Sequence, residues 1–187
     1  MRTYILGAKG TATAQFTVKK GATSATFTTT QAGKGDVKAT LVTPSGGTIA
    51  ASSPGKVFRA QQPNSDVYFV GHPDPGLWGV KVVVASAPGT VSVRVAFSQS
   101  PAGNASPVAR GTQTPNERTV TVDAATSTDA DGTIATYWWD FGDGTVASGA
   151  KAAHAYAGPG SFTINLVVQD NQGGLGFATL DPVTVVK

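Results

Sequence analysis

Cysteine is absent from the 187 residues of this chain, which excludes disulfide bonds, thiol catalysis and zinc sites built on cysteine. Charged residues make up only 13% of the sequence. No apolar stretch approaches the roughly 20 residues of a membrane helix. No segment carries the apolar period of a helix of three turns. The sequence therefore predicts a protein without membrane insertion and without long helices, and it leaves the compartment open.

The beginning of the chain gives little targeting information. Met1 and Arg2 lead into the short apolar fragment YIL, which is too short for the core of a signal peptide. We expect the chain to be a fragment of a longer protein, with Met1 added for expression.

Charge divides the chain into two halves. Residues 1–100 carry ten Lys and Arg against three acids, a net charge of +7, and residues 101–187 carry four against eight, a net charge of −4. The basic half could favour an acidic partner, but scattered solubilising lysines are the simpler interpretation. Basic residues are dispersed and do not alternate with aromatic ones, so no nucleic-acid partner is expected.

The segment SQSPAGNASP at 98–107 is the clearest boundary between folding units. It is rich in Ser, Gly and Pro and poor in large apolar side chains, which is typical of linkers. The sign of the charge changes at the same place. We therefore predict two domains, at residues 1–100 and 104–187.

Short strands with tight turns are what the remaining composition favours. The chain has 23 Gly and 11 Pro, and 40% of its residues are hydrophobic. Apolar and polar residues alternate with the period of a half-buried strand in many segments. Strands are expected at 14–18, 24–30, 37–43, 66–72, 77–85 and 90–97, and then at 118–124, 134–141, 161–170 and 177–186. The predicted fold class is all-β, with two tandem β-sandwiches.

The segment YWWDFGDGT at 137–145 combines four aromatic rings with two carboxylates. Because neighbouring residues of a strand point to opposite faces, Tyr137, Trp139 and Phe141 share one face, and Trp138 lies on the other. Three rings can bury roughly 150–250 Å² each, enough for much of a small core. The glycines that follow suit a hairpin turn. We interpret the segment as scaffold and not as a reaction centre.

The second half resembles a PKD domain, the immunoglobulin-like module named after the polycystic kidney disease protein. The matching motifs occur in the family's order: NASP at 104–107, STDADG at 127–132, WDFGDG at 139–144, HAY at 154–156 followed by GPG at 158–160, and VQD at 168–170 followed by Gly173. The resemblance implies a seven-strand sandwich without catalytic activity. It also implies a secreted or cell-surface protein, in bacteria often a peptidase, a chitinase or another polymer-degrading enzyme.

The first half is similar to jelly-roll sandwiches appended to secreted peptidases and to von Willebrand A-type proteins. The shared pattern is a proline–glycine turn followed later by a strand containing tryptophan, and it rests on Leu41, Pro44, Gly46, Pro75, Gly76 and Trp78. Such motifs concern packing and turns, so they imply a fold and no ligand.

A calcium site is expected in the second half. The segment at 127–132 begins like an EF-hand loop, but its first position is Ser127 and its twelfth would be Trp138, so it is not one. In some PKD domains of bacterial collagenases, an asparagine at the start of the domain, an Asp pair and a later Asp form a calcium site. That resemblance implies Asn104, Asp129, Asp131 and Asp170 as ligands. The alternative is that these acids only cap turns.

An outward-facing Trp138 marks a candidate contact surface. Aromatic rings stack on sugars or pack on extended protein polymers, and PKD modules of some secreted peptidases bind collagen or chitin in this way. The alternative is that Trp138 packs in a loop or against the first domain.

No constellation of residues predicts catalysis. The two histidines, His72 and His154, belong to separate domains, and no serine lies in a nucleophile-elbow motif. We predict a non-catalytic accessory fragment of a larger secreted or surface bacterial protein, which spaces, orients or attaches other domains of the parent chain. Direct binding to an extracellular polymer is the alternative, and a hydrolase in its own right is the second rival.

Overall fold

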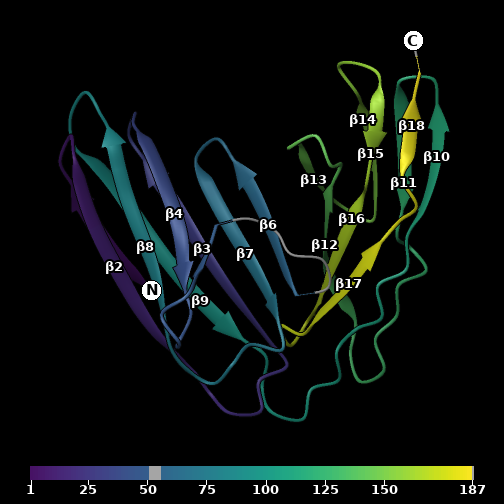
Figure 1. Cartoon of the computed structure of the whole chain (residues 1–187). Coiled ribbons are helices and arrows are strands. Elements are labelled where there is room, and N and C mark those ends of the chain that lie inside the picture. The colour runs from purple at the N-terminus through teal and green to yellow at the C-terminus, as the bar shows by residue number, and fades with distance from the viewer. Residues whose placement is uncertain (51–55, 187) are drawn as a thin grey trace.

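The computed structural model describes residues 1–50 and 56–186. In these residues every regular element is a strand, and the eighteen strands form two units that follow one another along the chain (Figure 1). No helix that could cross a membrane occurs in the described part of the chain. The predicted all-β class is therefore confirmed.

The first unit is a sandwich of nine strands in two sheets, with the orders β1-β9-β3-β7-β6 and β2-β8-β4-β5. The first strand pairs with the ninth, the second with the eighth, the third with the seventh and the fourth with the fifth. This nested antiparallel pairing is that of a jelly roll, to which β6 adds a hairpin. Its strands are β1 (Arg2–Leu6), β2 (Gly10–Val18), β3 (Ser24–Ala32), β4 (Asp36–Val42), β5 (Thr48–Ile49), β6 (Val57–Gln62), β7 (Ser65–Gly71), β8 (Gly76–Ser86) and β9 (Val91–Gln99).

The second unit is a smaller sandwich with the sheets β10-β11-β14, β13-β12-β16-β17 and β15-β18. No sheet among the described residues contains strands from both units. Its strands are β10 (Thr112–Asn116), β11 (Thr119–Asp123), β12 (Ile134–Asp140), β13 (Val146–Ser148), β14 (Lys151–Ala155), β15 (Gly160–Phe162), β16 (Asn165–Asp170), β17 (Leu175–Thr179) and β18 (Val183–Val185).

Each sandwich has its own core, built from alternate residues of its strands. In β9 the side chains of Val91, Val93 and Val95 are fully buried between the sheets of the first unit. In the second unit Trp139 is 0% exposed and Phe141 is 1% exposed. The aromatic face of the segment at 137–145 is therefore interior, as its alternation predicts.

Two expected strands are each divided in the structure. The run at 161–170 forms β15 and β16, and the break at 163–164 moves the chain from the β15-β18 sheet to the sheet of β12. The run at 177–186 is likewise divided between β17 and β18. The expected linker is also shorter, because β9 continues to Gln99 and Ser100 is fully buried. The buried Ser100 hydroxyl accepts the backbone N–H groups of Thr23 and Ser24, which ties this residue to the first sandwich.

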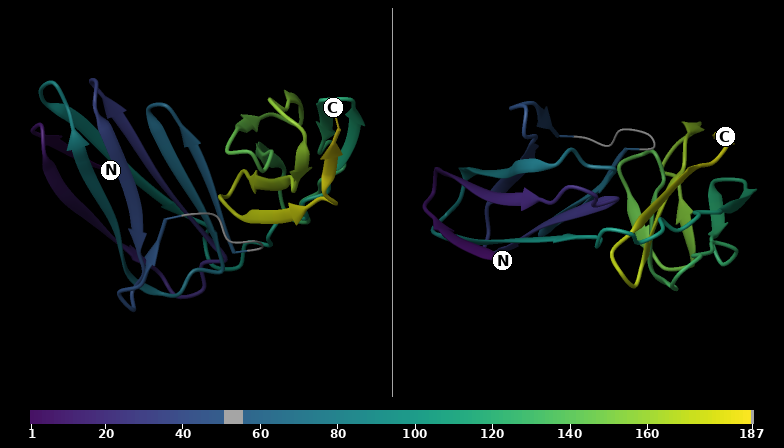
Figure 2. Two further views of the ribbon diagram at one scale, coloured as in Figure 1. Left: turned by 45° about the horizontal axis from the view of Figure 1, so that its top comes forward. Right: turned by 90° about the horizontal axis from the view of Figure 1, so that it is seen from below.

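The two sandwiches lie side by side and diverge from a shared end, so that the ribbon has the outline of a V (Figure 1). The views in Figure 2 place the N-terminus in the first sandwich and the C-terminus on the side of the second sandwich that is remote from the first. Strands β6 and β7 of the first unit face β12, β13 and β17 of the second (Figures 1 and 2).

Candidate functional site

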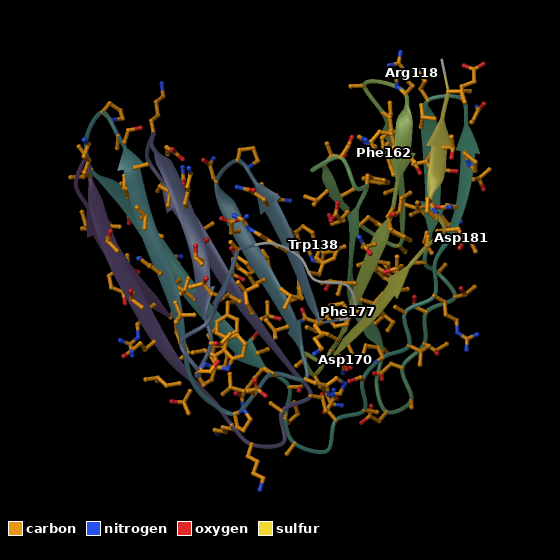
Figure 3. All side chains as sticks on the ribbon, viewed as in Figure 1. Arg118, Trp138, Phe162, Asp170, Phe177 and Asp181 are labelled. Atoms are coloured by element: carbon orange, nitrogen blue, oxygen red, sulfur yellow. The ribbon has the colours of Figure 1, made fainter. Side chains whose placement is uncertain are left out.

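The four expected metal ligands come from three segments of the second sandwich. Asp129 and Asp131 belong to the loop between β11 and β12, Asp170 ends β16, and Asn104 lies in the segment that joins the two sandwiches. A bridge between Val108 and Thr128, with N–O distances of 2.7 and 3.1 Å, holds the start of the domain beside this loop. Asp170 lies near the shared end of the V (Figure 3).

Asn104 and Asp170 are in direct contact and are both buried, at 6% and 2% exposure. The Asn104 amide donates from Nδ2 to Oδ2 of Asp170 over 2.9 Å. Oδ1 of Asp170 accepts the backbone N–H groups of Gln172 at 2.7 Å and Gly174 at 2.8 Å. The carboxylate thereby caps the turn after β16, while Oδ1 of Asn104 has no hydrogen-bond partner.

Asp129 is the unusual member of the group, because both of its carboxylate oxygens are buried without a hydrogen-bond partner. Burial and the charges of Asp170 and Asp131 raise the pKa of Asp129 above its usual range, although the nearby backbone N–H groups of Ala130 and Asp131 act in the opposite direction. A Cβ atom at Gly132 would lie 2.5 Å from Oδ2 of Asp129 and would also collide with Oδ1 of Asn171. Two oxygens thus crowd the same glycine. Sequence reasoning missed Asn171, which lies outside the motif pattern although it directly follows Asp170.

Asp131 is the most exposed of the four, and its Oδ2 accepts the backbone N–H of Ala105 at 3.1 Å. In residues 1–50 and 56–186, no three His, Cys, Asp or Glu side chains are close enough together to bind a metal ion by themselves. Among the four expected metal ligands, Asn104 has one buried side-chain oxygen without a hydrogen-bond partner, and Asp129 has two. Amide and carboxylate oxygens are what Ca²⁺ prefers, so the donor chemistry suits a hard cation, with further ligands from backbone or water.

Trp138 lies on the outer face of its sheet, beside Val167 of β16, which in turn pairs with Phe177 of β17. Its ring centroid is 5.9 Å from that of Phe69, which belongs to β7 of the first sandwich. The side chain is half-buried in this contact. Figure 3 shows Trp138 and Phe177 along the boundary between the two units. Its use as a contact for a polymer stays a prediction.

His154 forms an ion-pair contact at 2.8 Å between its Nε2 and Oδ2 of Asp143, and its ring stacks on Phe141. Burial alone would raise the pKa of Asp143, but hydrogen bonds from Thr145 and His154 lower it below its usual range. The Thr145 hydroxyl donates to Asp143 over 2.6 Å and is 3.3 Å from Nε2 of His154. The Thr145 hydroxyl and the His154 imidazole both hydrogen-bond directly to Asp143, so the trio does not have the relay order of a catalytic triad.

Tyr156 completes this cluster as the sequence motif implies. Its hydroxyl donates to the carbonyl oxygen of Phe141 at 3.0 Å, and its ring stacks on that of Phe162 with centroids 4.1 Å apart. His72 is exposed and has a φ of 46°, so it is a turn residue remote in sequence and in domain from His154.

Comparison with known proteins identifies a protein family in the second half of the chain. Residues 104–185 match the family model of the PKD domain. Collagenase ColA of Clostridium perfringens (strain 13 / Type A) is 44% identical over 59 residues, which are 32% of this chain and 5% of that protein. The microbial collagenase of Vibrio alginolyticus is 37% identical over 60 residues, which are 32% of this chain and 7% of that protein. The matched stretch is thus a small part of each relative.

Among solved structures, the PKD1 domain from the Vibrio cholerae metalloprotease PrtV superposes with a TM-score of 0.42 and 31% sequence identity. The superposition covers 44% of this chain and 100% of that domain. The motif order, the interior position of Trp139 and Phe141 and the match of the family model agree with one another. Residues 104–185 therefore belong to the PKD domain family.

Proposed function

We propose that this chain is a non-catalytic accessory region of a larger secreted or cell-surface bacterial protein, which is a peptidase or another polymer-degrading enzyme. The observation that carries the proposal is the PKD match at 104–185, together with relatives named as collagenases that are many times longer than the matched segment. In this function the two sandwiches space and orient other domains of the parent chain, which are its main partners.

The contacts made by the aromatic, acidic and histidine side chains of the 137–145 hairpin region support an accessory function. The aromatic rings around Trp139 fill the core, and the acids that follow them cap the hairpin, since Asp140 accepts the N–H of Gly142 and Asp143 that of Thr145. His154 is held by a hydrogen bond to Asp143 beside Phe141.

Direct attachment to collagen, chitin or another extracellular polymer is the second candidate, and Trp138 is the residue that would carry it. The position of Trp138 against Phe69 favours spacing over attachment. The large hydrophobic side chains that are exposed in the described residues are all non-aromatic, so they offer no stacking platform. They are Met1, Ile5, Leu77, Val108 and Val186.

Calcium is proposed as a structural cofactor of the second sandwich. Asn104 and Asp129 would supply their unpartnered oxygens, and Asp131 and Asp170 would add carboxylate oxygens from either side. Burial and the negative charges of Asp170 and Asp131 raise the pKa of Asp129, and a bound divalent cation would offset both effects. Titration calorimetry with CaCl₂ should show one binding event, and its absence at millimolar calcium would reject this part of the proposal.

Two assays test the accessory function on the chain as it is. Incubation with casein, gelatin and chromogenic glycosides should give no turnover, and reproducible hydrolysis would refute the proposal. Sedimentation with insoluble collagen or chitin should leave the protein in the supernatant. Binding that Trp138→Ala abolishes at unchanged melting temperature would instead establish the attachment function.

A further inference from the structure

The outer faces of two sheets, which would ordinarily meet water in a sandwich, cover each other at the boundary between the domains. The buried side chains of this boundary are Phe58, Ala60 and Phe69 of the first sandwich, and Val167 and Leu175 of the PKD domain, all at most 3% exposed. Trp138, Val146, Phe177 and Val67 pack around them. We refer to this set of nine residues as the joint cluster.

Hydrogen bonds between the domains flank the joint cluster. The hydroxyl of Ser24, a fully buried residue of β3, donates to the carbonyl oxygen of Gly173 over 2.6 Å. The side-chain amide of Gln169 donates to the Thr26 hydroxyl over 3.2 Å. These bonds fix the position of the turn after β16 relative to β3, which an apolar contact alone would leave free to slide.

The fit at the joint is close enough to exclude a methyl group. Gly71 ends β7 and has no left-handed φ, so its backbone could accept any residue. A Cβ atom there would lie 2.7 Å from a ring carbon of Phe177 in the other domain. The connection between the domains is also short, because Ser100 and Asn104, which flank the three residues 101–103, are both buried.

We propose that the jelly-roll sandwich and the PKD domain form a single rigid elbow, with the outer face of β6 and β7 as a dedicated docking surface for the PKD sheet. This inference deepens the proposed spacing function, because a rigid elbow fixes the direction in which the rest of the parent chain leaves. It also assigns Trp138 to the joint, where its ring is withheld from other partners. The relative orientation of the two domains can be measured in the isolated chain. The rigid elbow can therefore be confirmed or rejected independently of any peptidase or polymer.

The absence of cysteine allows the angle to be measured directly. Lys81→Cys and Ala153→Cys place one nitroxide label on an exposed position of β8 and one on β14. Pulsed electron paramagnetic resonance should give a single narrow distance distribution. Gly71→Val should shift its centre or at least double its width, since valine suits a strand but would collide with Phe177.

Two further variants keep the test decisive. Adding Phe177→Ala to Gly71→Val should restore a narrow distribution, because it removes the ring that collides. Gly7→Val is the matched control, because a Cβ at Gly7 would meet nothing within 4 Å, and it should leave the distribution unchanged. If Gly71→Val does not fold, Trp138→Ala alone should widen the distribution. A broad distribution in the unmodified pair, or a narrow one that neither Gly71→Val nor Trp138→Ala changes, would overturn the rigid elbow.

Discussion

Replacement of Asp129 by asparagine tests the candidate calcium site through the sign of a stability change. Without calcium, both carboxylate oxygens of Asp129 are buried and unpaired, and the neighbouring charges of Asp170 and Asp131 oppose its ionisation. Its pKa in the folded state is above the unfolded value of 3.8, so ionisation of this group destabilises the calcium-free protein as the pH rises above 3.8. Asparagine cannot ionise and therefore removes this penalty at neutral pH.

The magnitude follows from the unpaired atoms. A buried polar atom without a partner costs about 1–3 kcal/mol. The amide of Asp129→Asn could donate to Oδ1 of Asn171, which crowds the same side of Gly132. Because the backbone N–H groups of Ala130 and Asp131 offset part of this penalty, we expect the calcium-free variant to gain at most about 1 kcal/mol, or up to roughly 4–8 °C for a domain of this size. Calcium at a hundred times its dissociation constant would add about 2.7 kcal/mol to the unmodified protein but not to a variant lacking the carboxylate.

Scanning calorimetry at pH 7, in EDTA and in millimolar CaCl₂, measures both states. Asp129→Asn should melt above the unmodified protein in EDTA and below it in calcium. Asp123→Asn is the control, because Asp123 pairs with Lys151 on the surface of another sheet and should respond equally in both buffers. If Asp129→Asn lowers the melting temperature by the same amount in both buffers, the acid caps the turn and the calcium proposal fails.

Further substitutions probe single polar contacts in the two sandwiches. Tyr156→Phe removes the hydrogen bond to the Phe141 carbonyl and should lower the free energy of unfolding in urea by about 1 kcal/mol. Arg59→Met leaves the buried Asp66 without its partner and should cost about 3–5 kcal/mol, whereas combining it with Asp66→Leu should recover most of that loss. Asp143→Asn should make the free energy of unfolding less dependent on pH in the acid range. The lowered pKa of Asp143 stabilises the folded protein above pH 3.8, and this stability is lost as the pH falls through the folded-state pKa.

Strands with strict alternation could be predicted from the sequence alone. In β9 the three valines are buried and the residues between them are not, because a half-buried strand leaves its period in the sequence. Trp139 and Phe141 follow the same rule. The two glycines after them mark the end of the strand in the sequence, because Gly142 and Gly144 adopt φ values of 80° and 90°, which glycine tolerates best. Local chemistry determines these features, so a local pattern reveals them.

Other strands depend on partners far along the chain. In β14 the sequence KAAHA has no β-branched residue, and it forms a strand because Ala152 and His154 pair with Val122 and Val120 of β11. The run at 161–170 keeps its alternation through Ile164, yet the backbone changes sheets there. The pattern of burial continues across such a break, so hydrophobic period alone cannot locate it.

Calcium binding stays a prediction, because the four candidate ligands Asn104, Asp129, Asp131 and Asp170 were named from family resemblance. The bridge between Val108 and Thr128, which holds the start of the domain beside the β11–β12 loop, could not be predicted from the sequence. Asn171 lies outside the motif pattern, and its proximity to Asp129 follows only from the turn after β16.

The adjacent tryptophans show where sequence reasoning ends. Alternation puts Trp138 and Trp139 on opposite faces of β12, and it correctly makes one of them interior to the PKD core. What covers the other face depends on Phe69, which lies in another domain and about seventy positions earlier in the chain. An outward tryptophan has the same local pattern whether it meets a polymer, solvent or a neighbouring sheet. Because β12 contributes one ring to the core and the next to the joint cluster, the rigidity of the PKD sheet and the angle of the elbow depend on the same strand.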